Sequence, residues 1–302
     1  MTHMIKRIFV FATLLFGSAI VAHSASALTL TPSMQEVTLT PGEQTIVKVE
    51  LTNETDKTIE LTTEVVNFTS SGETGEPAFD FDAEATDLAT WAVPERGPFT
   101  LAPDESQDIL VTITTPDDAL PGGYYAAVLF NDTLGAESAG DVMIESKLGS
   151  LILATVEGNY TSAGAITEFS STTPQAGGNT EFTVRFKNSG DVHLKPTGTL
   201  VIKNMFGTEV TNATVNAEKG AVLPGSVRSF DVTPWLTSTS LFGKYTATLT
   251  MSDGAVSDTA ILSYWFFSTM WIGIIAGAII VIILLIVLLA KKGSHSITTP
   301  ES

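Results

Sequence analysis

The sequence predicts an all-β ectodomain made of two tandem immunoglobulin-like β-sandwiches, followed by one C-terminal transmembrane helix. Three observations support this fold class: short runs of alternating apolar and polar residues, an internal repeat, and a long uncharged apolar run near the C-terminus. Alternation with a period of two is typical of strands that bury one face, and several short strands of this kind are typical of sandwiches.

The apolar run Trp271–Ala290 reads WIGIIAGAIIVIILLIVLLA and carries no charge. A helix rises about 1.5 Å per residue, so a helix of this length spans the roughly 30 Å hydrocarbon core of a bilayer. The run therefore predicts a membrane anchor. Gly273 and Gly277 form a GxxxG spacing, which would permit two anchor helices to approach closely as a dimer.

Both ends of the chain predict its topology. Residues 1–27 combine a basic start, an apolar run and the small-x-small triplet Ala25-Ser26-Ala27, which together predict a cleaved signal peptide. Aromatic residues at 264–267 precede the anchor, and Lys291 and Lys292 follow it. By the positive-inside rule we expect a single-pass protein of the cell membrane, with its N-terminus outside and a cytoplasmic tail at 291–302.

The internal repeat divides the ectodomain into two modules, 28–160 and 161–263. PGEQTIVKVELTN at 41–53 matches AGGNTEFTVRFKN at 176–188, and the strands expected there cover 45–51 and 182–186, with a further strand at 109–113. Later in each half, a proline precedes a G-x-Y triplet at the same interval. The tyrosines of these triplets, Tyr124 and Tyr245, are expected to form tyrosine corners, in which the phenol bonds to upstream backbone.

The first module carries an insertion, 69–92, that the second lacks. Long loops on a rigid sandwich often bind ligands, so this is the expected recognition surface. Its aromatic residues and a nearby phenylalanine suit a groove for sugar or peptide, or alternatively a plug for the edge of the sandwich. Its acidic residues offer the hard oxygens that calcium prefers, although a solvated acidic loop is the simpler interpretation. The candidate groove residues are Phe79, Phe81, Trp91 and Phe99, and the candidate calcium ligands are Asp80, Asp82, Glu84 and Asp87; no other cofactor is expected.

Charge and composition exclude several function classes. Residues 28–160 contain 24 acidic and 4 basic side chains, whereas residues 161–263 contain 8 and 7. Such an acidic first module repels nucleic acid and anionic lipid. Cysteine is absent, which excludes disulfides and thiolate chemistry and suits a bacterial envelope. The mature ectodomain has one histidine, His193, in a turn-like stretch that predicts an exposed side chain, so neither a catalytic triad nor a multi-histidine zinc site is available and we expect no enzyme.

Several motifs in order resemble the WxL-interacting protein family of bacterial surface proteins. They are PGE at 41–43, TN at 52–53, LATWA at 88–92, LAPDES at 101–106, VTITTP at 111–116 and ALPGGYY at 119–125. The resemblance implies a signal peptide, an N-terminal peptidoglycan-binding-like module, a second sandwich associated with partner proteins, one transmembrane helix and a short basic tail. The chain contains no W-x-L triplet itself, so the resemblance implies the membrane-tethered partner rather than the WxL protein.

These observations predict a membrane-anchored binding or adhesion protein that holds a cell-wall glycan or peptide, or another surface protein, near the membrane. A different class is also open: a structural or chaperone-like subunit of a membrane or surface complex. An exposed strand edge that pairs with a client would favour this alternative.

Overall fold

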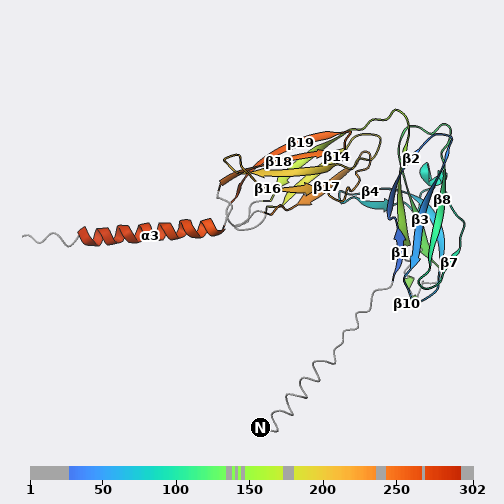
Figure 1. Cartoon of the computed structure of the whole chain (residues 1–302), viewed down its shortest axis with the longest axis horizontal. Helices are drawn as coiled ribbons and strands as arrows, with labels where there is room; N and C mark the ends of the chain where they lie inside the picture. Colours follow the sequence, from blue (N-terminus) through green and yellow to red (C-terminus); the bar gives the residue numbers. More distant parts are fainter. Residues whose placement is uncertain are drawn as a thin grey trace, which may run out of the picture.

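The computed structural model describes residues 27–133, 138–139, 142–143, 147–172, 180–235, 243–266 and 269–293. Two β modules are set at an angle to each other, and the long helix leaves the second module at the end away from the first (Figure 1). The predicted cleavage site and most of the predicted cytoplasmic tail lie outside the described residues.

Module 1 is a sandwich of two sheets. The first sheet has the order β1-β3-β8-β6, and the second has the order β2-β12-β9-β4-β5, with β7 also paired to β4. Within the second sheet, β2 runs parallel to β12 and the other pairs are antiparallel. The bounds are β1 Leu28–Thr31, β2 Met34–Leu39, β3 Gln44–Asn53, β4 Ile59–Ser71, β5 Glu76–Phe79, α2 Leu88–Trp91, β6 Ala92–Pro94, β7 Phe99–Leu101, β8 Ser106–Thr114, β9 Gly122–Asp132, β10 Ser138–Ala139, β11 Val142–Met143 and β12 Lys147–Val156.

The core of module 1 follows from the alternation seen in the sequence. Along β3, Val47, Val49 and Leu51 point inward, while Lys48 and Glu50 between them are exposed. The same period along β8 buries three further aliphatic residues against them. Strands expected at 45–51 and 109–113 are therefore observed, because their apolar faces meet inside the sandwich.

Module 2 is a second sandwich, with sheet orders β13-β14-β17 and β16-β15-β18-β19. Its core contains large side chains, among them Phe182, Phe186 and Tyr245, all almost fully buried. The fold class predicted from the sequence, two immunoglobulin-like sandwiches and one C-terminal helix, is confirmed. The bounds are β13 Gly164–Ser171, β14 Phe182–Asn188, β15 Thr197–Lys203, β16 Glu209–Val215, β17 Val227–Val232, β18 Gly243–Ser252, β19 Ser257–Phe266 and α3 Thr269–Gly293.

The repeat has a structural basis in two buried asparagines that end β3 and β14. The Asn53 side-chain amide donates to the carbonyl oxygens of Leu101 and Ala102 at 3.0 Å, and that of Asn188 donates to Val222 at 2.8 Å. Both side chains are fully buried. Each amide thus replaces backbone partners that the chain loses where a strand turns away, which explains why both halves keep asparagine there.

Helix α3 includes the predicted apolar run. Its segment Trp271–Leu289 has a mean hydropathy of 3.5 and is long and apolar enough to cross a membrane. A Cβ added at Gly273 or Gly277 would meet nothing within 4 Å, so that helix face is open. Membrane insertion, orientation and helix dimerisation remain predictions.

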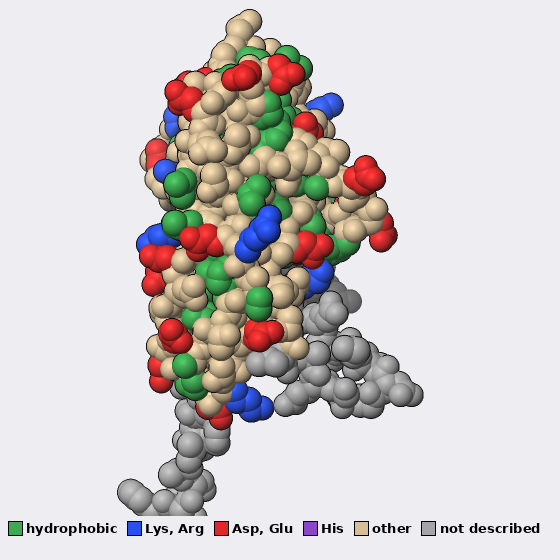
Figure 2. Space-filling view, turned by 90° about the vertical axis from the view of Figure 1, so that its right-hand side faces the viewer, with side chains coloured by type: hydrophobic (Ala, Val, Ile, Leu, Met, Phe, Trp, Pro, Cys, Tyr) green, Lys and Arg blue, Asp and Glu red, His purple; other side chains and the backbone are tan. Residues whose placement is uncertain are grey.

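The acidic side chains on one face of module 1 are dispersed. On the face that looks away from module 2, carboxylates are scattered among polar side chains and do not gather in one patch (Figure 2). Dispersed like charges favour solubility and do not by themselves build a cation site.

Candidate binding groove between the modules

The short connection between the modules is held by hydrogen bonds from the start of module 2. After β14, the backbone nitrogens of Ser189 and Asp191 donate to the carbonyl oxygens of Ala163 and Thr161, both at 2.8 Å. The Asp191 carboxylate accepts from the Thr161 nitrogen at 2.9 Å. A Cβ at Gly190 would lie 2.5 Å from the Thr161 oxygen, so only glycine permits this close approach. The connection is consequently fixed to module 2.

Module 1 contacts this same turn directly. The Gly123 nitrogen at the start of β9 donates to the Asp191 carbonyl oxygen at 2.8 Å. A Cβ at Gly123 would lie 2.2 Å from the Tyr125 phenol oxygen and 3.2 Å from the Asp191 oxygen. The glycine pair at 122–123 therefore allows the two modules to touch.

Nearby, Tyr124 shows the bond expected of a tyrosine corner. Its phenol donates to the Leu120 carbonyl oxygen at 2.8 Å. Tyr245, at the equivalent place in module 2, is buried beside Tyr264. The phenol bond of Tyr245 stays a prediction.

A long hairpin formed by β4 and β5 reaches from module 1 to module 2. Its tip residue Glu73 accepts from the Ser229 nitrogen at 2.8 Å through its backbone oxygen and from Arg185 Nε at 2.7 Å through its carboxylate. The hydrogen bonds from Arg185 to Glu73 and Glu168 raise the pKa of this guanidinium. Backbone and side chain of one residue thus bridge the modules.

Arg228 fills the space beside this bridge. A Cβ added at Gly75 of the hairpin would lie 2.2 Å from Arg228 Cζ, and one at Gly220 of module 2 would lie 2.6 Å from it. The guanidinium also donates to the Ala221 carbonyl oxygen at 2.9 Å. Burial lowers the pKa of Arg228, since charge is costly away from water. Two glycines from different modules therefore make room for one cation.

His193 forms a third contact between the modules, so the sequence-based prediction that it is an exposed loop residue is wrong. Its Nδ1 lies 3.4 Å from the Tyr125 phenol oxygen, and its Nε2 lies 3.2 Å from Glu36 Oε1. Lys195 pairs with the same carboxylate. The sequence shows only a turn at this position and cannot reveal that module 1 covers the ring.

These charges set the pKa values of the cluster. Burial lowers the pKa of His193 and outweighs the opposing effect of Glu36. A neutral imidazole that donates from Nε2 to Glu36 can accept the Tyr125 proton at Nδ1, which fits both distances. For Glu36, burial acts to raise the pKa, but Lys195 and His193 together leave it below its usual value.

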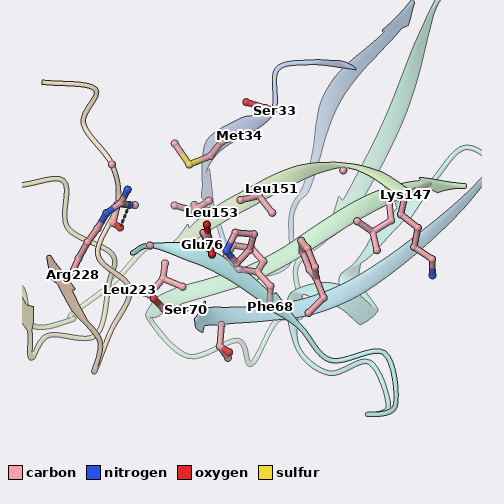
Figure 3. Close-up of a pocket in the computed structure, with 18 of the residues that line it drawn as sticks. Ser33, Met34, Phe68, Ser70, Glu76, Lys147, Leu151, Leu153, Leu223 and Arg228 are labelled. Carbon is pink, nitrogen blue, oxygen red and sulfur yellow. Dashed lines mark hydrogen bonds between the residues drawn. The ribbon is translucent and has the colours of Figure 1, made fainter. Parts of the chain in front are cut away.

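Between these contacts lies an apolar groove on the outer face of the second sheet of module 1. Its floor is formed by Phe68 of β4, Leu129 of β9, and Leu151 and Leu153 of β12, and its volume is about 470 Å³. Met34 lies at one side, and Leu223 of module 2 covers part of it. Figure 3 shows Lys147 at one end and Arg228 at the opposite end.

The sequence of β9 explains why this outer face is apolar. Residues 126–130, AAVLF, are all buried, so this strand does not alternate between a buried and an exposed face. Ala126, Val128 and Phe130 belong to the sandwich core, whereas Ala127 and Leu129 belong to a separate cluster beneath the groove. A strand that buries both faces is normal inside a layered fold, but here only one face is covered by a sheet.

The polar residues that line the groove are Ser33, Thr69, Ser70, Glu76, Lys147 and Arg228. Lys147 Nζ lies 4.4 Å from the centre of the Phe81 ring and 3.2 Å from Glu64 Oε2, so this cation is engaged within the chain. A second, more open hollow of about 890 Å³ adjoins the groove at Phe68–Ser70 and is lined by the turns at 120–125 and 223–227. The two hollows share Phe68, Thr69, Ser70 and Leu223.

The insertion predicted to bind a ligand contributes part of this groove. Phe79 and Phe81 line it, with their ring centres 6.0 Å apart. Trp91 instead packs on Tyr124, with ring centres 4.7 Å apart, and Phe99 is buried in the core of module 1. The four predicted aromatic residues therefore separate into one groove pair and one core pair.

The predicted calcium ligands do not converge. Among the described residues, which include Asp80, Asp82, Glu84 and Asp87, no three acidic or histidine side chains are arranged to hold a metal ion. The Asp80 carboxylate accepts from the backbone nitrogens of Asp82 and Ala83 at 3.2 and 3.1 Å. This arrangement is that of an Asx turn, in which the carboxylate serves the loop itself.

Neither a family model nor a curated protein sequence matches the chain. Among solved structures, it is similar to a chain of a chaperone–tip adhesin complex of CFA/I fimbriae, with 13% identity, a TM-score of 0.40, and coverage of 79% of this chain and 99% of the other. It is also similar to the E. coli chaperone DraB, with 12% identity, a TM-score of 0.36 and coverage of 80% and 97%. A third similar structure is a chain of the CsuC–CsuE pre-assembly complex of Acinetobacter baumannii, with 13% identity, a TM-score of 0.36, and coverage of 80% of this chain and 100% of the other.

Proposed function

We propose that the chain is a membrane-anchored extracytoplasmic binding protein whose groove between the modules holds an extended apolar segment of another surface protein. One observation carries the proposal: the apolar groove of about 470 Å³ at a junction that hydrogen bonds hold in place. A concave apolar pocket between two modules is a common form of ligand site.

The chemistry of the groove favours a protein segment over a wall glycan. Sugars present many hydroxyl groups that must keep hydrogen bonds on binding, whereas Leu129, Leu151 and Leu153 offer none. An extended peptide directs every second side chain toward one face, which suits an apolar floor built on strands. The acidic charge of module 1 also repels anionic wall polymers. We therefore place the cell-wall ligand second.

In this proposal, helix α3 anchors the binding groove at the cell membrane. It has the length and hydropathy of a membrane span, and we propose that it holds both modules outside the cell membrane. The resemblance to the WxL-interacting proteins agrees with this arrangement and rests on short motifs in module 1. In that setting the groove would present its ligand close to the membrane surface.

One observation favours the chaperone-like alternative. Strand β5 is the last strand in the order of its sheet, so the backbone groups along its outer side have no strand partner among the described residues. A client strand could pair there while its side chains enter the groove, as in other cases of strand addition. The two readings share a site and differ in whether the bound segment is released.

The test is a photo-crosslinking amino acid at Phe81, which is 50% exposed inside the groove, with Ile261, 68% exposed on β19, as the control site. On intact cells of the source, the Phe81 variant should give a discrete protein adduct that the Ile261 variant lacks. Adding Leu151→Glu should abolish the adduct without loss of the folded protein. A peptide copied from the captured segment should then bind the purified full-length chain.

Other outcomes would contradict the proposal. An adduct of equal yield at Ile261 would mean non-specific proximity, and an adduct that survives Leu151→Glu would place the partner outside the groove. Co-sedimentation of the protein with purified sacculi, insensitive to Leu151→Glu, would favour wall binding elsewhere on module 1. Transient adducts that disappear when synthesis of new protein stops would favour the chaperone-like alternative.

A further inference from the structure

The end of module 2 nearest to α3 carries four large apolar side chains that are exposed to solvent. They are Met205 at 53%, Phe206 at 73%, Trp235 at 72% and Trp265 at 52% exposed. Isolated exposed apolar residues are ordinary on soluble domains. These four belong to three separate segments of the chain, namely the turn between β15 and β16, the segment after β17, and the end of β19.

Strand register places the turn and the end of β19 together. Gly243, the first residue of β18, is opposite Phe266, the last residue of β19, and Lys244 is opposite Trp265. A Cβ on Gly243 would lie 2.3 Å from the terminal methyl group of Met205, so the β15–β16 turn rests against the start of β18.

The segment after β17 lies at this same end. Val232, which ends β17, is opposite Phe182 of β14, and the Phe182 ring contacts that of Tyr264, with centres 5.4 Å apart. Tyr264 lies two residues before the end of β19. Trp235 follows Val232 by three residues and therefore lies at the α3 end of the module.

The chain length between β19 and α3 limits how far this end can lie from a membrane. β19 ends at Phe266 and α3 begins at Thr269, so the two are separated by three Cα steps, or at most about 11 Å. The headgroup layer on each side of a bilayer is roughly 5–8 Å thick, which is half the difference between the thickness of the whole bilayer and that of its hydrocarbon core. If α3 spans the membrane, this end of module 2 therefore lies at the headgroup layer or within a few ångströms of it.

We propose that this end of module 2, defined by Met205, Phe206, Trp235 and Trp265, is a membrane-docking surface that inserts its side chains into the headgroup region around α3. The proposal rests on the membrane anchoring in the proposed function and adds that the folded module itself contacts lipid. Tryptophan favours this interface, because its ring buries apolar area while the indole nitrogen keeps polar contacts, and phenylalanine adds further apolar area.

Local charge does not favour docking through anionic lipid alone. Lys203 and Lys244 lie at this end, but Glu209 is opposite Lys203, and Glu181 and Asp231 lie at the same end of the other sheet. The basic and acidic groups nearly balance. The apolar side chains therefore carry the contact, and it should form on neutral as well as on anionic membranes.

Docking would have a consequence for the groove. A module joined to a helix by two residues can still tilt, because such a link restrains distance more than direction. Contacts from three separated segments restrain direction as well, so module 2 would stand at a fixed angle to the membrane. Hydrogen bonds to module 1 would then hold the groove at a defined height and orientation.

The absence of cysteine makes the test direct, since single cysteines can be placed and spin-labelled without background labelling. Full-length variants Phe206→Cys and Trp235→Cys are reconstituted into vesicles of phosphatidylcholine alone and of phosphatidylcholine mixed with phosphatidylglycerol. Two controls have comparable exposure: Leu120→Cys in module 1, exposed 73%, and Ile261→Cys on β19, exposed 68%. Ile279→Cys in the middle of α3 reports insertion of the anchor.

The measurement compares relaxation of each label by oxygen, which concentrates in lipid, and by a water-soluble nickel chelate. We expect the oxygen-to-nickel ratio at 206 and 235 to exceed that at 120 and 261 several-fold in both lipid mixtures. Ratios at 206 and 235 equal to the controls, with a lipid-like ratio at 279, would overturn docking and leave the anchor intact. A water-like ratio at 279 would overturn the anchor and the docking together, and a raised ratio confined to anionic vesicles would overturn the apolar basis of the contact.

Discussion

Replacement of Asn53 by alanine should destabilise module 1 strongly. The side-chain amide nitrogen of Asn53 donates to the carbonyl oxygens of Lys57, Leu101 and Ala102 at 2.8, 3.0 and 3.0 Å, and its oxygen accepts from the Thr55 nitrogen at 3.0 Å. Alanine removes all of these bonds at once from a site with no solvent exposure. The Lys57 oxygen keeps a bond from Thr55 Oγ1 at 3.0 Å, whereas the carbonyl oxygens of Leu101 and Ala102 lose this donor.

The number and burial of these hydrogen bonds determine the expected loss of stability. Each net hydrogen bond contributes about 1 kcal/mol, and a buried group left unpaired costs roughly 1–3 kcal/mol. The bond to Leu101 is buried and the others are partly buried, so water can reach some of the abandoned groups. We therefore expect a loss of about 3 kcal/mol, equivalent to a fall of roughly 10 °C in the melting temperature of a module of this size.

Tryptophan fluorescence can report on module 1 alone. Trp91 is its only tryptophan, so changing the other three to phenylalanine leaves a single reporter in the full-length protein in detergent. Urea unfolding would then compare Asn53→Ala with Asn159→Ala, an exposed asparagine of module 1 whose loss should cost less than about 0.5 kcal/mol.

Asn53→Asp makes the comparison sharper. Aspartate keeps the size and the acceptor oxygen of asparagine, but it replaces the donor nitrogen that faces three carbonyl oxygens by a second acceptor oxygen. It should cost at least as much as alanine. The reasoning would be refuted by an aspartate variant as stable as wild type, or by an alanine variant that loses less than about 1 kcal/mol, which is the value of one ordinary bond.

Four further predictions concern the junction and the tyrosine corner. Burial lowers the pKa of His193 from its ordinary 6.5, so the folded state binds fewer protons than the unfolded state and stability should fall as pH decreases below 6.5. The urea midpoint of His193→Gln should therefore change less than that of wild type between pH 7 and 5. The lowered pKa of Glu36 adds a second loss below pH 4.5, which Glu36→Gln should remove. Arg185→Gln should change the urea midpoint little, because its ion pairs are exposed to solvent, yet it should widen the intermodule distance distribution between spin labels. Tyr124→Phe should cost about 1 kcal/mol for its single phenol bond, and an unchanged urea midpoint would argue against a tyrosine corner.

The fold could be predicted from the sequence because its determinants are local. Alternation along residues 45–51 fixes which side chains of β3 point inward, whatever the rest of the chain does. The matched asparagines at 53 and 188 gave the repeat, and the repeat gave two modules. The uncharged run at 271–290 needed no tertiary information at all.

The groove could be predicted only in part because it depends on how the modules meet. Phe79 and Phe81 were predicted through the insertion that contains them. Trp91 belongs to the same insertion, yet it packs on Tyr124 in module 1 and does not line the groove. Leu129 and Leu151 were missed, since an apolar residue on a strand is normally assigned to the core. The one available signal was the unbroken run AAVLF at 126–130, which is too apolar for a strand with one solvated face.

His193 shows the same limit in a polar residue. Its neighbours in the sequence describe a turn, and turns are usually exposed. The residues that bury it, Tyr125 and Glu36, come from two strands of the other module. Periodicity within one segment carries no information about such a partner.

A groove at a junction is only as well defined as the junction itself. Here the lining comes from both modules, with Leu151 on one side and Leu223 and Arg228 on the other, so any change in the angle between the modules changes the shape of the site. A bound segment that touches both modules must favour the angle at which it fits, and contacts that hold this angle must strengthen binding by the same free energy. Arg185→Gln and His193→Gln should therefore weaken binding of the captured peptide although neither side chain lines the groove, while Tyr124→Phe, which leaves the junction intact, should not.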